Sequence, residues 1–296
     1  MSKIKTIVML NITVFTPTYN RAYILRQLYN SLKTQEYHDF EWLVIDDGSN
    51  DSTQQLIESW MAEENSFEIR YYKQPNGGKH RAINNALGKA RGLLFFIVDS
   101  DDWLTPDALL KVATWEQSLP EGVKWCGVAG NLGTAIDYTP NTPLPSQPYD
   151  ATLFERYTNV SGERAHVFYT EIAKKYPYPE FESEKFMTEA VVYNRMARDG
   201  YMMRFYDDII WVYEYKNDGL TKAGVALFQR NPMGYGLWLR EKQEFMKPGF
   251  VNKMRLQYSF LAEMKNLAPI STIAKAIGAN RLCTYLFLII LKLRGV

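Results

Sequence analysis

The feature that most constrains this chain is an apolar run that ends abruptly in aspartates. The run is Leu93–Val98, and it is followed at once by Asp99, Asp101 and Asp102. A short continuous apolar run bounded by polar residues is typical of a strand that is buried on both faces of a sheet. Carboxylates this close together repel one another unless a cation or strong hydrogen-bond donors compensate them. The sequence therefore predicts a buried strand that ends on a site for a positively charged group.

Three further apolar runs precede this one, and helical patterns separate them. They predict strands over Ile12–Thr16, Phe40–Ile45 and Ile69–Lys73, each followed by a turn and by apolar residues at helical spacing. Alternating strands and helices are typical of βα units that pack on a mainly parallel sheet. We therefore expect an α/β fold in which helices flank such a sheet.

Polar loops follow three of the four predicted strands. Their sequences are PTYN at Pro17–Asn20, DDGS at Asp46–Ser49 and DSDD at Asp99–Asp102. Ligands of open α/β sheets bind beyond the carboxyl ends of the strands. We therefore expect the three loops to converge on one edge of the sheet and to form a binding site there.

The pattern becomes less regular in the second half of the chain. Four prolines between residues 140 and 148 predict a surface loop or lid, residues 186–200 predict a helix, and residues 202–215 predict two strands. The sequence beyond residue 222 has a mostly helical pattern. We therefore expect an α/β domain over residues 1–225 and a helical C-terminal extension over residues 226–296.

The composition is that of a globular protein that binds its ligand at a local site. Hydrophobic residues make up 46% of the chain, charged residues 23%, and the net charge is +1, so there is no global attraction to nucleic acid. Cys126 and Cys283 are too few for a disulfide framework or a zinc site, which favours a reducing compartment. The first residues contain no small-residue cleavage site, so we expect no signal peptide and a cytoplasmic location.

Several kinds of site would explain the aspartates after the apolar run. They could simply accept backbone N–H bonds in a turn, although one aspartate would be enough for that. A calcium loop is excluded because its sixth position, counted from Asp99, is Leu104 instead of glycine. A phosphatase could use Asp99 as a covalent nucleophile, but Trp103 stands where such enzymes carry a small residue. The alternative that uses every acid is Mg²⁺ or Mn²⁺, shared with the phosphates of a nucleotide.

Such a metal would make a nucleoside diphosphate a competent leaving group, because the metal absorbs the charge that develops as the bond breaks. The three motifs also occur in an order, and at a helix-sized spacing, that resembles the family-2 glycosyltransferases. The resemblance is strong over residues 12–103 and extends more loosely to Thr221. It implies the GT-A fold, with a nucleotide-binding half over residues 1–115 and an acceptor-binding half over residues 116–225.

The resemblance also implies an activity. It predicts an inverting, metal-dependent glycosyltransferase that moves a sugar from a nucleoside diphosphate sugar, such as a UDP-sugar, to a hydroxyl of a glycan or lipid-linked acceptor. Bacterial surface polysaccharide synthesis is the expected context. An Asp-nucleophile phosphatase and a catalytically inactive glycan-binding protein are the two alternatives.

Individual residues receive expected roles from the same resemblance. Pro17 and Tyr19 are expected to cup the nucleotide, and Asp47 to accept a hydrogen bond from the uracil N–H. Ser100 belongs to the nucleotide-sugar site, next to the two acids of the Asp-x-Asp pattern.

The acids of that pattern have separate expected roles. Asp99 is expected to face the ribose or the metal, and Asp101 to bind Mn²⁺ or Mg²⁺. Asp102 is expected to orient the loop instead of binding the donor.

The sequence departs from the family at a basic position. Many relatives carry an Ala-Arg-Asn triplet, whereas this chain has Ala82, Ile83 and Asn84, so the arginine is missing. Lys79 lies about one turn away at a predicted helix N-terminus, which favours phosphate binding. We expect Lys79 to make the compensating contact; a solvated basic helix start would explain the same residue.

An inverting transfer also needs a base that takes the proton of the acceptor hydroxyl. Relatives supply it from a Glu-Asp pair that opens a helix, and this chain has only Thr188 and Glu189 there. We expect Glu189 to be the base, with Glu180, Glu182 and Glu184 as alternatives. A structural role for Glu189 at a helix N-terminus remains open.

Three features of the second half concern the acceptor and the membrane. Aromatic residues between 176 and 181 could form a platform for a sugar ring, although burial in the core would explain them too. Residues 217–221, NDGLT, could form a mobile lid. Residues 281–294 contain LFLIIL between cations, too short to span a bilayer, and could either contact the inner membrane surface peripherally or pack into the core.

Overall fold

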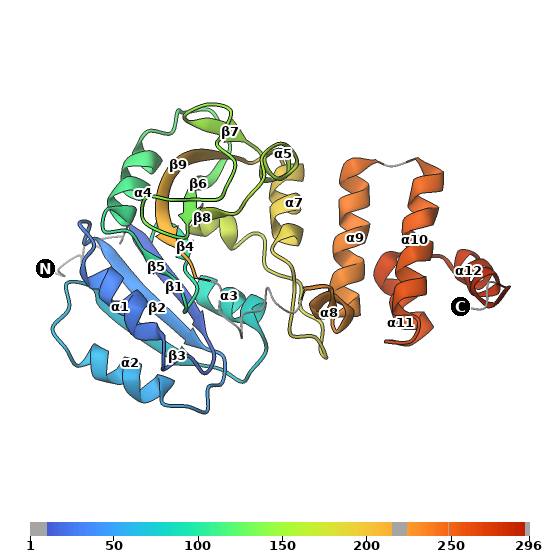
Figure 1. Cartoon of the computed structure of the whole chain (residues 1–296), viewed down its shortest axis with the longest axis horizontal. Helices are drawn as coiled ribbons and strands as arrows, with labels where there is room; N and C mark the ends of the chain where they lie inside the picture. Colours follow the sequence, from blue (N-terminus) through green and yellow to red (C-terminus); the bar gives the residue numbers. More distant parts are fainter. Residues whose placement is uncertain (1–10, 215–223, 248, 294–296) are drawn as a thin grey trace, which may run out of the picture. The chain divides into compact units, whose positions relative to one another are not determined.

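The structure is a computed structural model of the 296-residue chain, and it describes residues 11–214, 224–247 and 249–293. Within these residues the largest element is a nine-stranded sheet in the order β3-β2-β1-β4-β8-β6-β9-β5, with β7 paired to β9 (Figure 1). Helices pack against the strands, so the predicted α/β class is confirmed.

The N-terminal part of the sheet is parallel, as predicted. The strand β1 (Ile12–Thr18) lies between β2 (Phe40–Asp46) and β4 (Leu94–Ile97), and β2 also pairs with β3 (Glu68–Lys73). All of these pairs run in the same direction, so the carboxyl ends of the strands lie at one edge.

One predicted boundary in this region is wrong. The strand β1 was expected to end before Pro17, but it continues through Pro17 to Thr18. Phe15 accepts a backbone bond from Val98 on the β4 side, and the register with β4 ends at this residue. The backbone of Pro17 faces the β4 side two residues later, beyond the end of the register with β4, although Pro17 still aligns with Ile45 of β2. Its missing N–H therefore removes no ladder bond.

Antiparallel pairs complete the sheet. The strand β8 (Arg164–Tyr169) is antiparallel to both β4 and β6 (Trp125–Gly133), while β6 runs parallel to β9 (Met202–Val212). Two short strands, β5 (Trp103–Leu104) and β7 (Tyr149–Ala151), pair antiparallel with β9. The two strands expected within residues 202–215 are thus one strand, whose register with β6 shifts near Asn131.

One core cluster forms where helices cover the sheet. It combines β1, β2 and β4 with α1 (Leu25–Lys33), α2 (Thr53–Met61) and α4 (Ala108–Gln117). The rings of Tyr29 and Trp60 stack there with centroids 4.3 Å apart. The helix α3 (Lys79–Leu87) packs against β1 and β2, and α5 (Leu153–Asn159) and α6 (Thr170–Ala173) follow β7 and β8.

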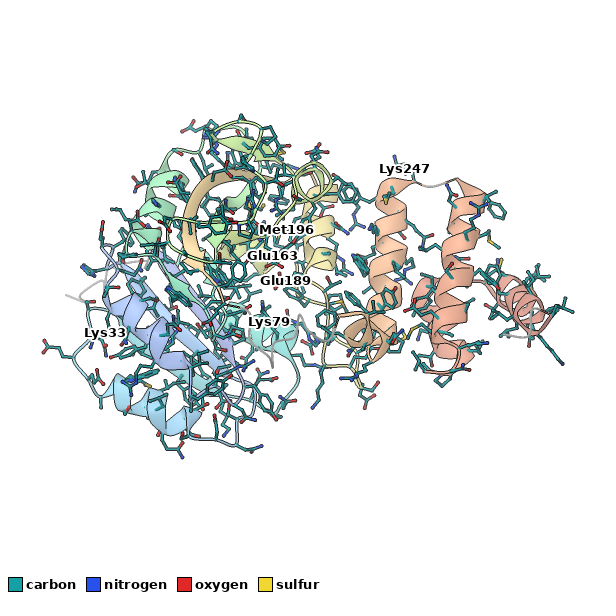
Figure 2. The ribbon with its side chains drawn as sticks, viewed as in Figure 1. Lys33, Lys79, Glu163, Glu189, Met196 and Lys247 are labelled. Carbon is teal, nitrogen blue, oxygen red and sulfur yellow. The ribbon has the colours of Figure 1, made fainter. Side chains whose placement is uncertain are left out.

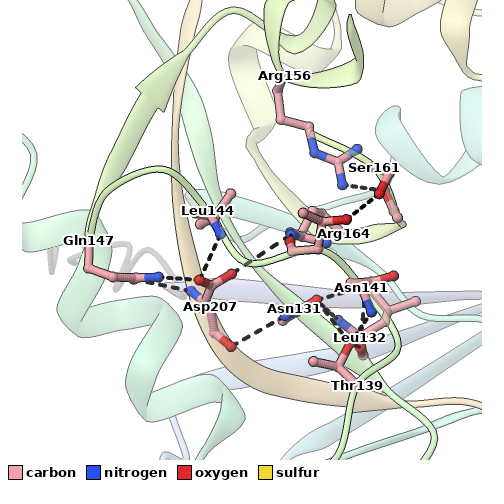
Figure 3. A network of polar contacts seen from close by, with 12 residues as sticks. Asn131, Leu132, Thr139, Asn141, Leu144, Gln147, Arg156, Ser161, Arg164 and Asp207 are labelled. Carbon is pink, nitrogen blue, oxygen red and sulfur yellow. Dashed lines mark hydrogen bonds and ion pairs between the residues drawn. The ribbon is translucent and has the colours of Figure 1, made fainter. Parts of the chain in front are cut away.

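The proline-containing segment is fixed to the sheet by polar contacts (Figure 3). Asn141 Nδ2 donates to Asn131 Oδ1 at 2.7 Å, and the Leu144 N–H donates to Asp207 Oδ2 at 2.9 Å. The buried Arg164 side chain donates from Nη2 to the Thr142 carbonyl at 2.7 Å. The segment is therefore a loop pinned to β6, β8 and β9.

Contacts divide the chain into two compact units. The first unit comprises Met1–Pro177 and Asp199–Lys216, and the second comprises Tyr178–Arg198 and Asn217–Val296. This division differs from the boundary expected at residue 225, because the segment before Asp199 groups with the C-terminal helices. Arg195 explains the grouping, since its guanidinium holds Glu241 with two bonds of 2.7 and 3.0 Å.

The second unit is helical in its described part, as predicted for the C-terminal extension. Gly236 lets two of its helices approach closely, because a Cβ there would lie 2.5 Å from the Cβ of Ala276. Phe260 and Ile273 are among the residues of the core that this packing buries. The helices are α7 (Ala190–Arg198), α8 (Gly224–Gln229), α9 (Pro232–Met246), α10 (Phe250–Met264), α11 (Ile270–Ile277) and α12 (Arg281–Leu293).

Candidate active site

The polar loops at the carboxyl ends of the parallel strands are connected to one another. The Asn20 N–H donates to Ser49 Oγ at 2.8 Å, and the Asn50 N–H donates to Asn20 Oδ1 at 2.8 Å. Asn20 has a positive φ of 54°, and Gly48 has a φ of 88°, so both turns use left-handed backbone. Together with the contacts below, these bonds confirm the predicted convergence. We call loops 17–20, 46–49, 75–78 and 99–102 the carboxyl-end rim.

Asp47 is the centre of a network that fixes the turn before α3. Gln74 Nε2 and the Gly77 N–H donate to its Oδ1, each at 2.8 Å, while Asn76 Nδ2 and the Gly78 N–H donate to its Oδ2 at 3.1 and 2.7 Å. A carboxylate offers about four acceptor positions. Asp47 is also only 4% exposed. The predicted bond from uracil stays a prediction, and it requires one of these donors to move aside.

Lys79 joins the third loop to the fourth. It is the first residue of α3, and its Nζ lies 2.8 Å from Asp99 Oδ1 and 3.0 Å from Asp99 Oδ2 (Figure 2 labels Lys79). Both side chains are partly exposed, at 28% and 36%. Lys79 therefore forms an ion pair with Asp99 at the rim, while part of both side chains remains accessible to solvent.

Burial and neighbouring carboxylates disfavour the charged forms of two aspartates in the DSDD turn. Burial, and then the charge of Asp99, raise the pKa of Asp101. Burial, followed by the charges of Asp99 and Asp101, raises the pKa of Asp102 to about 8. Trp211 Nε1 donates to Asp102 Oδ2 at 2.8 Å, which anchors the turn to β9. The turn is therefore attached to β9, and a nearby cation would favour the charged forms of its carboxyl groups.

This donor set fits a hard divalent cation. Asp99 and Asp101 offer carboxylate oxygens, the ligands that Mg²⁺ and Mn²⁺ prefer, and a dication would relieve the charge that raises the pKa of Asp101. In the part of the chain that the structure describes, no three His, Cys, Asp or Glu side chains are grouped so as to hold an ion. Phosphate oxygens and water would therefore have to complete the shell.

The other residues expected at the nucleotide differ in accessibility. Tyr19 is 46% exposed and follows β1 at the rim, where it is free to meet a ligand ring. Pro17 is half-buried near the end of the strand β1, and Ser100 is buried at 6% exposure between the two acids. Tyr19 therefore offers the largest apolar surface of the three.

Glu189 belongs to the second unit, at the start of α7 (Figure 2). Tyr193 lies one turn further along the helix and donates from its hydroxyl to Glu189 Oε2 at 3.0 Å. The predicted helix over residues 186–200 is shorter than expected and begins at Ala190, so Glu189 immediately precedes its first residue. The base role of Glu189 stays a prediction.

Glu184, one of the alternative bases, has a structural role instead. It is 3% exposed, and its two oxygens accept the Met233 and Gly234 N–H groups at 2.6 and 2.8 Å. These donors belong to the first turn of α9, which has Pro232 as its first residue. A buried carboxylate on otherwise unpaired N–H groups of a helix start is a cap. Both carboxylate oxygens of Glu184 are therefore engaged in hydrogen bonds within the second unit.

Two histidines and one residue of the expected sugar platform lie in the interior. His80 and His166 are buried, and burial followed by the nearby Arg156 and Arg164 holds the pKa of His166 well below its usual range. Tyr178 is also buried and does not fit the expected sugar platform. The NDGLT segment, expected as a lid, lies outside the described residues.

Comparison with known proteins places the chain in a family. A family model described as "Glycosyl transferase family 2" matches residues 13–171, which include the whole carboxyl-end rim. The chain belongs to glycosyl transferase family 2. The predicted family and enzyme class are thereby confirmed.

Named relatives of this family 2 chain match it over part of their length. The chondroitin synthase of Pasteurella multocida (strain Pm70) is 30% identical over 157 residues, which are 53% of this chain and 15% of that protein. The GalNAc(5)-diNAcBac-PP-undecaprenol beta-1,3-glucosyltransferase of Campylobacter jejuni is 34% identical over 124 residues, which are 40% of this chain and 37% of that protein. The chain thus spans well under half the length of these relatives.

Solved structures agree with the fold. Staphylococcus aureus TarS 1–349 in complex with UDP-GlcNAc has a TM-score of 0.58 at 17% identity, covering 88% of this chain and 82% of that chain. The mannosyltransferase PcManGT from Pyrobaculum calidifontis in complex with GDP-Man and Mn²⁺ has a TM-score of 0.56 at 18% identity, covering 94% and 78%. At such identities the likeness shows the fold, and it confirms the GT-A prediction.

Two site contacts in this family 2 chain were not predicted from its sequence. Trp211 reaches Asp102 from 109 residues away along the chain, and no local pattern signals that pairing. Tyr71 donates its hydroxyl to Asp46 Oδ2 at 2.6 Å, and its position on β3, next to β2, is the one signal that could have found it.

Proposed function

We propose that this family 2 chain transfers a sugar from a nucleoside diphosphate sugar, with a UDP-sugar as the first candidate, to a hydroxyl of a glycan or lipid-linked acceptor. Bacterial surface polysaccharide synthesis is the proposed context. The carboxyl-end rim carries the proposal, because it gathers an exposed aromatic ring, a cation and a pair of carboxylates in a chain of this family. A nucleoside diphosphate needs a partner for its base and a counter-charge for its phosphates. The rim contains groups suited to both.

The ligands named for the two similar structures support this choice. One of those structures holds UDP-GlcNAc and the other holds GDP-Man with Mn²⁺. We assign Pro17 and Tyr19 to the base and ribose, and Ser100 to the edge of the nucleotide. Asp47 holds the turn before α3 and reaches the base only through a rearrangement of that turn.

For the diphosphate we assign two carboxylates and one lysine. Asp101 and Asp99 would hold Mn²⁺ or Mg²⁺, and Lys79 would exchange its bond to Asp99 for one to a phosphate oxygen. The ion, when bound, takes up negative charge that develops on the leaving diphosphate. Lys79 would add a second positive charge next to the same leaving group. Its Nζ lies 3.0 Å from Asp99 Oδ2, so it is already beside one of the proposed metal ligands.

The transfer itself requires a base on the acceptor side. The acceptor hydroxyl oxygen forms a bond to the anomeric carbon as the bond from that carbon to the diphosphate oxygen breaks. We assign the released proton to the Glu189 carboxylate, which gives inversion without a covalent enzyme intermediate. Tyr193, which donates to Glu189, would hold the carboxylate in one orientation.

Calorimetric titration of UDP in the presence of Mn²⁺ tests the donor site. We expect Asp101→Asn to abolish Mn²⁺-dependent UDP binding, because it removes the more enclosed metal ligand. Asp137→Asn, at an exposed position, is the matched control and should bind like the wild type. Unchanged affinity in Asp101→Asn would remove Asp101 from the proposed metal site.

Hydrolysis of a panel of nucleotide sugars then separates this proposal from an inactive glycan-binding protein. An active enzyme should release UDP or another nucleoside diphosphate from at least one donor, whereas an inactive protein would bind UDP without turnover. The family assignment argues against the phosphatase alternative. A phosphatase would use Asp99 as its nucleophile, and both carboxylate oxygens of Asp99 contact Lys79.

A further inference from the structure

The last described helix, α12, has two apolar faces. On one face Phe287 and Leu291 are buried, and the Phe287 ring meets Tyr258 of α10 edge-on with centroids 5.6 Å apart. The second face is exposed in the part of the chain that the structure describes. Its side chains and exposed fractions are Leu282 70%, Tyr285 68%, Leu286 47%, Ile289 55%, Ile290 39% and Leu293 81%.

These exposed residues form one stripe, which we call the α12 stripe. At about 100° per residue, they fall within a sector of roughly 140° opposite the buried face. Burial in the core, which the sequence left open for this segment, therefore accounts for only half of the helix surface. A soluble surface rarely presents so many adjacent large apolar side chains without a partner.

The C-terminal segment that contains the stripe has a strongly positive net charge. Residues 224–296 contain eleven Lys or Arg and three Asp or Glu, a net charge of +8, whereas the whole chain has a net charge of +1. Lys292 is exposed and flanks the stripe on the same helix. The helix α12 itself contains no acidic residue.

We propose that the α12 stripe lies on an anionic lipid bilayer, with its apolar side chains in the boundary between headgroups and acyl chains. A short apolar face bordered by cations fits that boundary, because the apolar residues leave water while the cations meet lipid phosphates. Among the described residues, none of the helices has the length and hydrophobicity that a bilayer-spanning segment requires. Two copies of a segment with a net charge of +8 would repel each other, which disfavours self-association through this surface.

The inference does not depend on the proposed sugar transfer, and its test uses no substrate. The full chain is floated with vesicles of phosphatidylcholine alone and with mixed phosphatidylglycerol–phosphatidylcholine vesicles. We expect the protein to float with the anionic vesicles, to float far less with the neutral ones, and to lose binding as the salt concentration rises.

Two exposed positions of the stripe provide the decisive variant. Leu286→Glu combined with Ile289→Glu should lower partitioning onto anionic vesicles by at least ~10-fold, because it places two charges at the apolar boundary. The matched control is Leu110→Glu combined with Val123→Glu, which makes the same charge change at two exposed apolar positions of the first unit. Partitioning of this control onto anionic vesicles should fall far less. Far-ultraviolet circular dichroism verifies that both proteins are folded.

A single-charge comparison tests the electrostatic part. Lys292→Gln should weaken partitioning by roughly fivefold, as expected for one cation near an anionic surface. Lys124→Gln, an exposed lysine of the first unit, should have a smaller effect.

Several outcomes would overturn the inference. These are failure of the wild type to float with anionic vesicles, or equal flotation of the wild type and the Leu286→Glu, Ile289→Glu variant. Sedimentation gives a third outcome: a wild-type dimer that the same variant converts to monomer, without vesicle binding, would assign the stripe to a second copy of the chain.

Discussion

Lys79 contacts the Asp99 carboxylate at the carboxyl-end rim, and we propose that it exchanges this contact for a phosphate of the donor. We predict that Lys79→Met has effects of opposite sign on two ligands. Mn²⁺ should bind the variant roughly fivefold more tightly, because a competing positive charge is removed from Asp99. UDP should bind more weakly, because a phosphate loses its cation.

Calorimetric titration of each ligand separately checks both signs. Lys124→Met, at an exposed position of the same unit, is the control and should leave both affinities unchanged. If Lys79→Met also leaves both unchanged, the lysine has no part in donor binding.

Glu189 offers a second test at the scale of one residue. We predict that Glu189→Gln lowers turnover by ~10²–10⁴-fold while UDP binding stays near normal, because the amide cannot take the acceptor proton. The amide oxygen can still accept the Tyr193 hydroxyl bond, so the local structure should persist. Turnover is measured as nucleoside diphosphate release, with Glu121→Gln, at an exposed position of the first unit, as the control. Full activity in Glu189→Gln would move the base to another residue.

We predict that His166 makes the stability of the fold depend on pH. Burial and the charges of Arg156 and Arg164 hold the pKa of His166 well below the usual 6.5. Just below pH 6.5 this imidazole is therefore protonated in the unfolded chain and neutral in the folded chain. Its contribution to stability is therefore complete above about pH 6.5 and falls as the pH drops below it, by at most ~1.4 kcal/mol per pH unit.

Urea unfolding at several pH values above and below 6.5 measures this slope. His166→Gln should flatten it, whereas His38→Gln, at an exposed position, should retain it. A slope that is identical in all three proteins would show that His166 does not cause it.

At the scale of the element, the start of α9 depends on a side chain from another segment. We predict that Glu184→Ala destabilises the second unit by ~1–3 kcal/mol, because it leaves the Met233 and Gly234 N–H groups without their carboxylate. Glu182→Ala, two residues away and exposed, is the control and should have little effect. Thermal unfolding followed by circular dichroism compares them. Equal melting temperatures would contradict the capping role.

The elements differ in how far their sequences predict them. The strands β1–β4 have β-branched and aromatic runs, and their boundaries were predicted to within two residues. The strand β6 was missed because its sequence, WCGVAGNLG, contains three glycines with low strand propensity. Tertiary packing requires at least one of them, since a Cβ on Gly127 would lie 1.9 Å from the Val167 carbonyl oxygen. Gly127 permits the close packing of β6 against β8, but its low strand propensity is one reason why the sequence does not predict β6 as a strand.

At the scale of the whole molecule, all residues that we assign to the donor belong to the first unit. We predict that UDP with Mn²⁺ slows hydrogen exchange in the four rim loops, at residues 17–20, 46–49, 75–78 and 99–102. The helices α10–α12 should exchange as before, because no residue assigned to the donor lies on them. Mass spectrometry of peptic peptides measures both regions. Protection confined to α10–α12 would contradict the assignment of the donor to the rim.

The sequence by itself determined the first four strands, the loops at their carboxyl ends and the family. These features are local: each depends on residues adjacent in the chain, and parallel βα units bring consecutive strand ends to one edge. Only the tertiary structure decided that Asp47 is enclosed by four donors, that Trp211 anchors Asp102 and that Glu184 caps α9. Such contacts join segments far apart along the chain, and the pairing depends on which buried surfaces fit together, which no local pattern encodes.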